Sequence, residues 1–321
     1  MTFDPFASVA ELSAAISSRK LSPVAVTEQY LDRIAKLDPK YKAFIAVYGD
    51  DARQAAEAAD KAIRSGHAVG PLHGVPIALK DLVDLEGRIT MGGCAAWADR
   101  VSPVTATLAK LLIAQGMIVL GKTHTVEFAM GGWGTNTQLG TPWNPWDPKV
   151  HRTPGGSSSG SGVAVAVGMA PCAIGTDTGG SVRLPASWDG ITALKVTVGR
   201  ISTYGVLPLS ESLDTPGPMT RNVEDSAILF KVLQGVDPND PRTAWQPPCD
   251  PMPSLKAGVA GLKLGVIEPA DREAVDTEVL AAYDASVETL AKLGAKIVKV
   301  TLPIRFREAV EVQTAITAPE A

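Results

Sequence analysis

The sequence predicts an α/β protein, and three observations support this class. Short apolar runs alternate with amphipathic segments along most of the chain. Glycine (30 residues) and proline (24) are frequent, as many short connections require, whereas aromatic residues make up only 5%. The chain of 321 residues, 45% hydrophobic and 20% charged, is ample for a large core. This composition favours packed helices and strands over an aromatic-rich all-β architecture.

The N-terminal part, residues 1–66, is expected to be mainly helical. Ser8–Glu11 is a capping-box pattern, and Ser22-Pro23 combines an N-cap with proline at the first helical position. Apolar residues then recur at helical spacing over Val24–Leu37. A short strand is predicted at Ala43–Val47 and an alanine-rich helix at Asp51–Ser65.

The following core, about residues 67–235, alternates between strand and helix patterns. Its predicted elements are strands at Val75–Leu79, Met117–Leu120 and Cys172–Ile174, and helices at Thr107–Gln115, Val163–Met169 and Val223–Leu233. A C-terminal part, about 254–321, adds strands at Leu262–Ile267 and Lys296–Val300, a helix at Asp276–Leu293 and a helix from Phe306. The Pro- and Asp-rich segment Asp237–Pro253 is either a domain joint or, as we prefer, a surface excursion within one domain.

Charge and cysteine usage exclude several classes of function. The formal net charge is −4 and basic residues are scattered, so no surface for nucleic acid is predicted. No apolar run approaches the ~20 residues of a membrane helix, and the N-terminus does not resemble a signal peptide, which predicts a cytoplasmic protein. Three distant cysteines without a CxxC pair indicate neither a disulfide framework nor a metal site, and no cofactor is expected.

Two glycine- and serine-rich runs, Pro154–Gly162 and Gly175–Pro185, carry the strongest chemical signal. Closely flanking apolar elements leave no room for a flexible linker, so the glycines are expected to let backbone N–H groups approach a ligand. The amides of Thr178, Gly179 and Gly180 stand just ahead of a serine. Such donors suit a developing oxyanion.

An activated serine also needs a base. None of the four histidines lies in either serine run: they are His67, His73, His124 and His151. A lysine kept neutral by burial is the other solution. Lys80 ends the apolar run Val75–Leu79 and is a candidate, although by itself a lysine after a strand is more often a solvated surface charge.

Several segments together resemble the amidase signature family. Gly74–Asp81 and the two serine-rich runs occur in its order and spacing, as do Gly121-Lys122-Thr123 with Glu127-Phe128-Ala129 and Leu194-Lys195 with Gly199-Arg200. The resemblance extends from about Leu12 to Leu302. It implies a single domain over residues 1–321, with a central mixed β-sheet flanked on both faces by α-helices.

The resemblance also implies site roles. Ser181 would be the nucleophile, Ser157 the bridging serine of a Ser-cisSer-Lys triad, and Lys80 the base. The 24-position interval to Ser181 selects Ser157 over the two serines that follow it. The remaining roles fall into two groups: backbone oxyanion donors at Thr178, Gly179 and Gly180, and loop support from Ser158, Asp177 and Arg183.

On this basis neutral Lys80 would draw a proton through Ser157 from Ser181, which attacks a carboxamide and forms an acyl-enzyme. Three functions stay open: a stand-alone amidase for a small or aryl amide, which we prefer; the glutaminase (A) subunit of a tRNA-dependent amidotransferase; and a catalytically incomplete fragment. The expected partner is a small-molecule amide, without direct nucleic acid or membrane, and a homodimer is left open.

Two further motif matches are rejected because the surrounding sequence does not fit the corresponding structure. Gly116–Thr123 fits the Walker A expression, but its variable residues are themselves a predicted strand rather than a phosphate-binding turn. Gly156–Gly160 fits GxSxG, but the α/β-hydrolase order needs a histidine after the serine, and the last one is His151. His151 and the neighbouring Trp143 and Trp146 serve either a pocket or ordinary loop packing.

The chain departs from the family pattern in three ways. It stops at Ala321, within the helix from Phe306, where family members usually continue, so we expect the C-terminal part to be truncated. Asp189 stands where a cysteine is common, and Val196 stands where proline is usual.

Overall fold

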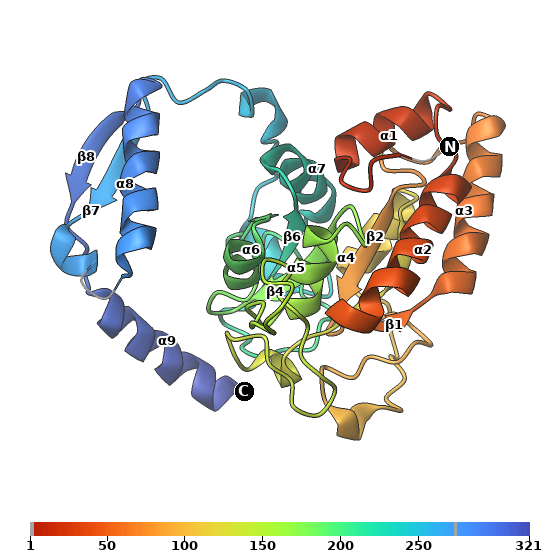
Figure 1. The fold of residues 1–321 in the computed structure, drawn as a ribbon, viewed down its shortest axis with the longest axis horizontal. Helices are drawn as coiled ribbons and strands as arrows, with labels where there is room; N and C mark the ends of the chain where they lie inside the picture. The colour runs from red at the N-terminus through yellow and green to blue at the C-terminus, as the bar shows by residue number, and fades with distance from the viewer. Residues whose placement is uncertain (1–2, 273–274) are drawn as a thin grey trace. The chain divides into compact units, whose positions relative to one another are not determined.

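The computed structural model describes residues 3–272 and 275–321, with only the backbone of Phe306. The chain forms two compact units, one of residues 1–250 with 320–321 and one of residues 251–319 (Figure 1). The boundary between them lies inside the Pro- and Asp-rich segment Asp237–Pro253. The single domain over residues 1–321 stays a prediction.

The larger unit is built on a mixed six-stranded sheet of order β1-β3-β2-β4-β6-β5. Strands β3, β2 and β4 are mutually parallel, whereas β1, β6 and β5 pair antiparallel with their neighbours. The predicted α/β class with a mixed central sheet is therefore confirmed. The strand bounds are β1 (Phe44–Val47), β2 (Pro76–Lys80), β3 (Ile118–Thr123), β4 (Ala173–Asp177), β5 (Thr192–Ala193) and β6 (Thr215–Thr220).

The N-terminal helices are α1 (Val9–Ser17), α2 (Pro23–Tyr41) and α3 (Gly49–Arg64). The predicted capping box is present, because the Ser8 hydroxyl accepts the Glu11 N–H at 3.0 Å and the Glu11 carboxylate accepts the Ser8 N–H at 2.8 Å. Helices α2 and α3 pack against each other and against β3. They bury the apolar positions that predicted them.

Helix α5 (Ser159–Ala166) packs across β2, β3, β4 and β6 (Figure 1). It begins four residues before the predicted start at Val163, so the end of the first serine-rich run is helical. A Cβ at Gly160 would overlap the backbone of Ala43 and His124, and one at Gly162 would overlap the Asp189 carboxyl. These two glycines therefore allow close packing of α5, rather than an approach to a ligand as the sequence suggested.

The remaining helices of this unit are α4 (Thr107–Ala114), α6 (Arg183–Asp189) and α7 (Val223–Leu233). Helix α6 and strands β5 and β6 were not predicted from the sequence. Strand β6 contains Pro216 and Pro218, which cannot donate to a ladder and argue against a strand flanked on both sides. Short 3₁₀ turns lie at Ala95–Trp97, Glu127–Ala129 and Pro241–Trp245.

The smaller unit has a parallel pair of strands, β7 (Lys263–Ile267) and β8 (Lys296–Val300), joined through α8 (Thr277–Lys292). Asp276 caps α8 by accepting the Glu278 N–H. Helix α9 (Phe306–Glu320) follows, and short 3₁₀ turns lie at Met252–Ser254 and Pro269–Arg272. These strands and helices confirm the predicted C-terminal elements.

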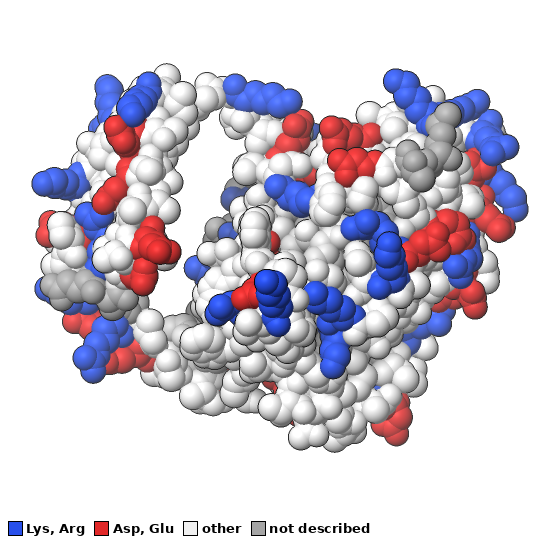
Figure 2. All heavy atoms as spheres, in the orientation of Figure 1, with Lys and Arg blue, Asp and Glu red and all other residues white. Residues whose placement is uncertain are grey.

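The surface carries no concentrated charge on the face that Figure 2 shows, where basic and acidic side chains are interspersed. Within residues 3–272 and 275–321, no helix has both the length and the apolar character needed to cross a bilayer. The three cysteines are free thiols, two of them buried.

Candidate active site

Lys80 is the last residue of β2, between β3 and β4 in the middle of the sheet. Its side chain is completely buried. Its Nζ donates to the Ser157 hydroxyl at 2.7 Å and to the Thr176 hydroxyl, on β4, at 2.7 Å. Lys80 is therefore a buried amine hydrogen-bonded to the predicted bridging serine, and not the surface charge that a lone lysine suggests.

Burial lowers the pKa of Lys80 to about 7, because the charged ammonium loses its hydration, while Asp214 and Asp177 act in the opposite direction. A substantial fraction of Lys80 is thus neutral at physiological pH. Such an amine can accept a proton from a hydroxyl to which it is hydrogen-bonded.

A second buried lysine, Lys122 on β3, is hydrogen-bonded to neither Ser157 nor Thr176. Its Nζ donates to the Thr90 hydroxyl at 2.7 Å and lies 3.7 Å from the Asp81 carboxylate. Burial lowers the pKa of Lys122 to about 8 and raises the pKa of Asp81 to about 6. Of these two buried lysines, Lys122 lies beside a carboxylate, whereas Lys80 is hydrogen-bonded to two hydroxyl groups.

The backbone of Ser157 is hydrogen-bonded to the segment that follows β3. The Ser157 carbonyl accepts the Val126 N–H at 3.2 Å and the Thr125 hydroxyl at 3.1 Å. The Gly156–Ser157 peptide bond is cis. These contacts fix the position of Ser157 relative to both Lys80 and the segment that contains Val126.

Ser158 connects the two serine-rich runs. Its hydroxyl accepts the Thr176 N–H at 3.1 Å and donates to the Thr176 carbonyl at 3.2 Å. Its N–H donates to the Ser181 carbonyl at 3.2 Å. The residue next to Ser157 is therefore bonded to the backbone of the predicted nucleophile, which brings the two serines together although 24 positions separate them in the chain.

Asp177 organises the loop that carries Ser181. Its carboxylate accepts the N–H groups of Gly180 at 2.7 Å and Val182 at 3.2 Å, and both oxygens pair with the Arg183 guanidinium at 2.9 Å. Burial by itself would raise the pKa of Asp177, but Arg183 and the two N–H donors hold that pKa below its ordinary value. The loop thus curls around an ionised carboxylate.

The predicted oxyanion donors differ in availability. The Gly180 N–H is already donated to Asp177, so in this geometry it is not free for an oxyanion. Among the described residues, the N–H groups of Thr178, Gly179 and Ser181 make no hydrogen bond to the protein. The occupied amide of Gly180 and the free amide of Ser181 were not foreseen, since sequence spacing does not show where the Asp177 carboxylate points.

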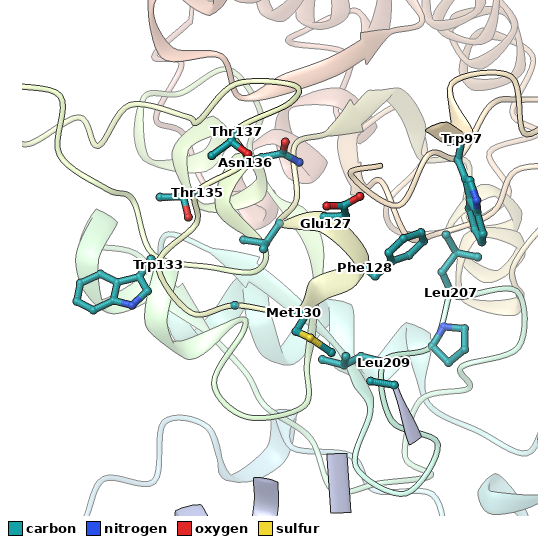
Figure 3. A pocket seen from close by; sticks show the side chains of 14 residues that line it. Trp97, Glu127, Phe128, Met130, Trp133, Thr135, Asn136, Thr137, Leu207 and Leu209 are labelled. Carbon is teal, nitrogen blue, oxygen red and sulfur yellow. The ribbon is translucent and has the colours of Figure 1, made fainter. Parts of the chain in front are cut away.

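A pocket of about 840 Å³ lies next to the backbone of Ser157 and is drawn in Figure 3. Trp97 and Phe128 lie on one side of it, with their rings 4.8 Å apart in an edge-on contact, and Trp133 lies on the opposite side. Other apolar lining comes from Val126, Met130, Leu207 and Leu209, and the charged side chain among the described lining residues is Glu127.

Backbone hydrogen bonds connect this part of the chain with Gly156 and Ser157. Val126 lines the pocket and donates to the Ser157 carbonyl, and the Gly156 N–H donates at 2.8 Å to the carbonyl of Gly132, which lies between the lining residues Gly131 and Trp133. The side chains of Lys80 and Ser157 are not among the described lining residues. The pocket therefore lies beside the bridging serine and is separated from the lysine.

Trp143, Trp146 and His151 serve loop packing. Trp143 stacks on His151 with ring centroids 4.6 Å apart and donates its indole N–H to the Asp147 carbonyl. The Trp146 indole N–H donates to the Asp189 carbonyl at 2.8 Å. None of the three lines the pocket in the described part of the chain.

The chain belongs to the amidase family, whose model matches residues 25–321. It is similar to the glutamyl-tRNA(Gln) amidotransferase A subunit of Thermobifida fusca (strain YX), with 42% identity over 298 residues, covering 92% of this chain and 59% of that protein. It thus spans about three fifths of the length of the curated relatives it matches.

Solved structures agree with this assignment. A peptide amidase from Stenotrophomonas maltophilia is 34% identical with a TM-score of 0.89, over 98% of this chain and 65% of that one. A bacterial aryl acylamidase of the amidase signature family is 30% identical, also with a TM-score of 0.89, over 98% and 65% of the two chains. The resemblance found in the sequence is therefore confirmed.

Proposed function

We propose that the protein hydrolyses a carboxamide C–N bond through an acyl-enzyme on Ser181. The observation that carries the proposal is Lys80, a fully buried amine with a pKa of about 7 and a 2.7 Å hydrogen bond to Ser157. A titratable group with a perturbed pKa that is hydrogen-bonded to a serine hydroxyl is typical of catalytic sites.

In the proposed mechanism Lys80 accepts the Ser157 proton while Ser157 accepts that of Ser181. The Ser181 oxygen then bonds to the amide carbon, and the negative charge that develops on the carbonyl oxygen is stabilised by the free N–H groups of Thr178 and Gly179. When the C–N bond breaks, the same relay returns the proton to the departing nitrogen. Water, deprotonated along the same path, releases the acid and restores Ser181.

We further propose a stand-alone amidase for amides with an aryl or apolar group. The pocket beside Ser157 is lined by Trp97, Phe128 and other large apolar side chains, which suit such groups. Its described lining contains Glu127 and no lysine or arginine that would pair with a substrate carboxylate. This pocket is therefore less suited to a free amino acid such as glutamine, which carries a carboxylate.

The second candidate is the glutaminase component of a tRNA-dependent amidotransferase. It is favoured by the 42% identity to the Thermobifida fusca amidotransferase protein. In this case ammonia released from glutamine would pass to a partner protein of the same complex.

The test is a comparison of substrates on the purified chain and on its Ser181→Ala variant. Nitroanilides and primary amides of aryl and apolar acids are assayed beside L-glutamine, following aniline or ammonia release. Hydrolysis of the apolar amides that Ser181→Ala abolishes would support the stand-alone amidase. Glutamine hydrolysis alone would support the second candidate. No turnover by a chain that unfolds in one sharp transition would contradict both, and would favour a catalytically incomplete fragment.

A further inference from the structure

Asp214 immediately precedes β6, and its side chain accepts three hydrogen bonds. The Thr178 hydroxyl donates to one carboxylate oxygen, and the N–H groups of Leu209 and Ser210 donate to the other at 2.8 Å and 3.1 Å. Next to it, the Thr215 hydroxyl donates to the Asp177 carbonyl at 2.8 Å. A single carboxylate thus gathers backbone and side-chain donors from two separate loops.

These two loops have different parts in the candidate site. Thr178 opens the loop that leads to Ser181, and its own N–H is one of the free amides there. Leu209 belongs to the wall of the large pocket, together with Leu207 (Figure 3). The Asp214 carboxylate is therefore a direct connection between the wall that would hold the substrate and the loop that would stabilise the oxyanion.

The charge of Asp214 also acts on the site. It favours the protonated form of Lys80, as does Asp177, against the effect of burial. Asp214 also lines a cavity of about 400 Å³ with Glu211, Asp240 and Arg242, in which Arg242 is paired with Asp240 at 2.9 Å. The negative charge of Asp214 also acts on Arg242, although among the described residues the ion pair of Arg242 is with Asp240.

We propose that Asp214 is a positioning residue that bonds the loop before Ser181 to the substrate-pocket wall and adds its negative charge to the site. This inference rests on the proposed function. It gives Asp214 two separable effects, one through its hydrogen bonds and one through its charge. Variants that remove one without the other can therefore distinguish it from a residue that merely supports the fold.

The test compares Asp214→Asn with Thr178→Val on an apolar nitroanilide across pH 5–9. Asp214→Asn removes the charge; its amide oxygen can still accept the Leu209 and Ser210 N–H groups, but its NH₂ no longer accepts the Thr178 hydroxyl, so kcat is expected to fall about 10–100-fold and KM to rise. Loss of the negative charge should also move the acidic limb of kcat/KM to lower pH by roughly half a unit. Thr178→Val keeps the charge, so kcat should fall while the acidic limb stays in place.

The outcomes distinguish a failure of the proposed function from a failure of the inference about Asp214. If the parent chain is inactive on every amide, the proposed function fails and the inference about Asp214 fails with it. If the parent is active but Asp214→Asn leaves the acidic limb and KM unchanged, the inference about Asp214 is wrong and the triad is unaffected. Thermal midpoints of both variants, measured in parallel, show whether a loss of rate merely follows a loss of folded protein, which would also contradict the positioning role.

Discussion

Replacing Asp189 with cysteine is expected to stabilise the protein at neutral pH. Asp189 ends α6 with 2% of its surface exposed, and neither carboxyl oxygen has a hydrogen-bond partner among the described residues. Burial raises the pKa of Asp189 well above its ordinary value, with no charged neighbour to oppose it. The side chain is therefore a buried carboxylic acid that nothing in the described structure compensates.

The direction in which the stability changes with pH follows from proton linkage. The unfolded chain releases the Asp189 proton near pH 3.9, whereas the folded chain retains it to higher pH. Stability from this group is therefore complete below about pH 3.9 and is lost, by about 1.4 kcal/mol per pH unit, as the pH rises to the folded-state pKa. An unsatisfied buried polar group costs about 1–3 kcal/mol, so Asp189→Cys should gain about that much at pH 8 and less at pH 5. For a unit of this size each kcal/mol raises Tm by about 2–4 °C.

Thermal unfolding followed by circular dichroism at pH 5 and pH 8 measures both effects. Ser187→Cys is the matched control, since it adds a thiol at an exposed position of the same helix. A lower Tm for Asp189→Cys at pH 8, or an equal gain at both pH values, would refute the reasoning. Either result would mean that the carboxyl has a compensating partner.

Three further predictions concern the site and the helix behind it. The rate kcat/KM should rise with pH through about 7, because Lys80 must lose its proton to act as a base; a pH–rate profile flat from 5 to 9 would exclude that role. Arg183→Ala should lower kcat by about 10–100-fold, since Asp177 loses its bidentate partner and the loop it organises shifts; steady-state kinetics measure this, and unchanged kcat would make the ion pair dispensable. Gly160→Ala should destabilise the protein by about 1–3 kcal/mol, because the new Cβ overlaps the backbone of His124; urea unfolding tests it, and an unchanged midpoint would disprove the overlap.

Much of the site could be predicted because its residues stand at the ends of strongly patterned elements. Lys80 closes an apolar strand, and the spacing of the serine-rich runs matched that of a known family. The structure then brings Lys80 and Ser157 within hydrogen-bond distance and connects Ser158 to the Ser181 backbone. Local sequence alone was not sufficient for Lys80, because a lysine after a strand is more often a solvated surface charge; the resemblance to the family selected it.

Other parts had no local signal. Strand β6 contains two prolines and forms only because β4 and β5 flank it, so tertiary pairing overrides propensity. Thr176 and Asp214 are ordinary polar residues whose contacts with Lys80 and Thr178 depend on how distant segments meet. The early start of α5 was missed because glycine and serine have low helix propensity, and close packing against His124 outweighs it.

The most direct test of the account is intact-mass spectrometry after incubation with a fluorophosphonate, which reacts with an activated serine. The account predicts one adduct on the parent chain, located at Ser181 by peptide mapping, absent from Ser181→Ala and much slower to form in Lys80→Ala. An adduct that persists in Ser181→Ala, or forms at the same rate without Lys80, would contradict the proposed triad. A well-folded parent that forms no adduct would show that this chain does not hold an activated serine.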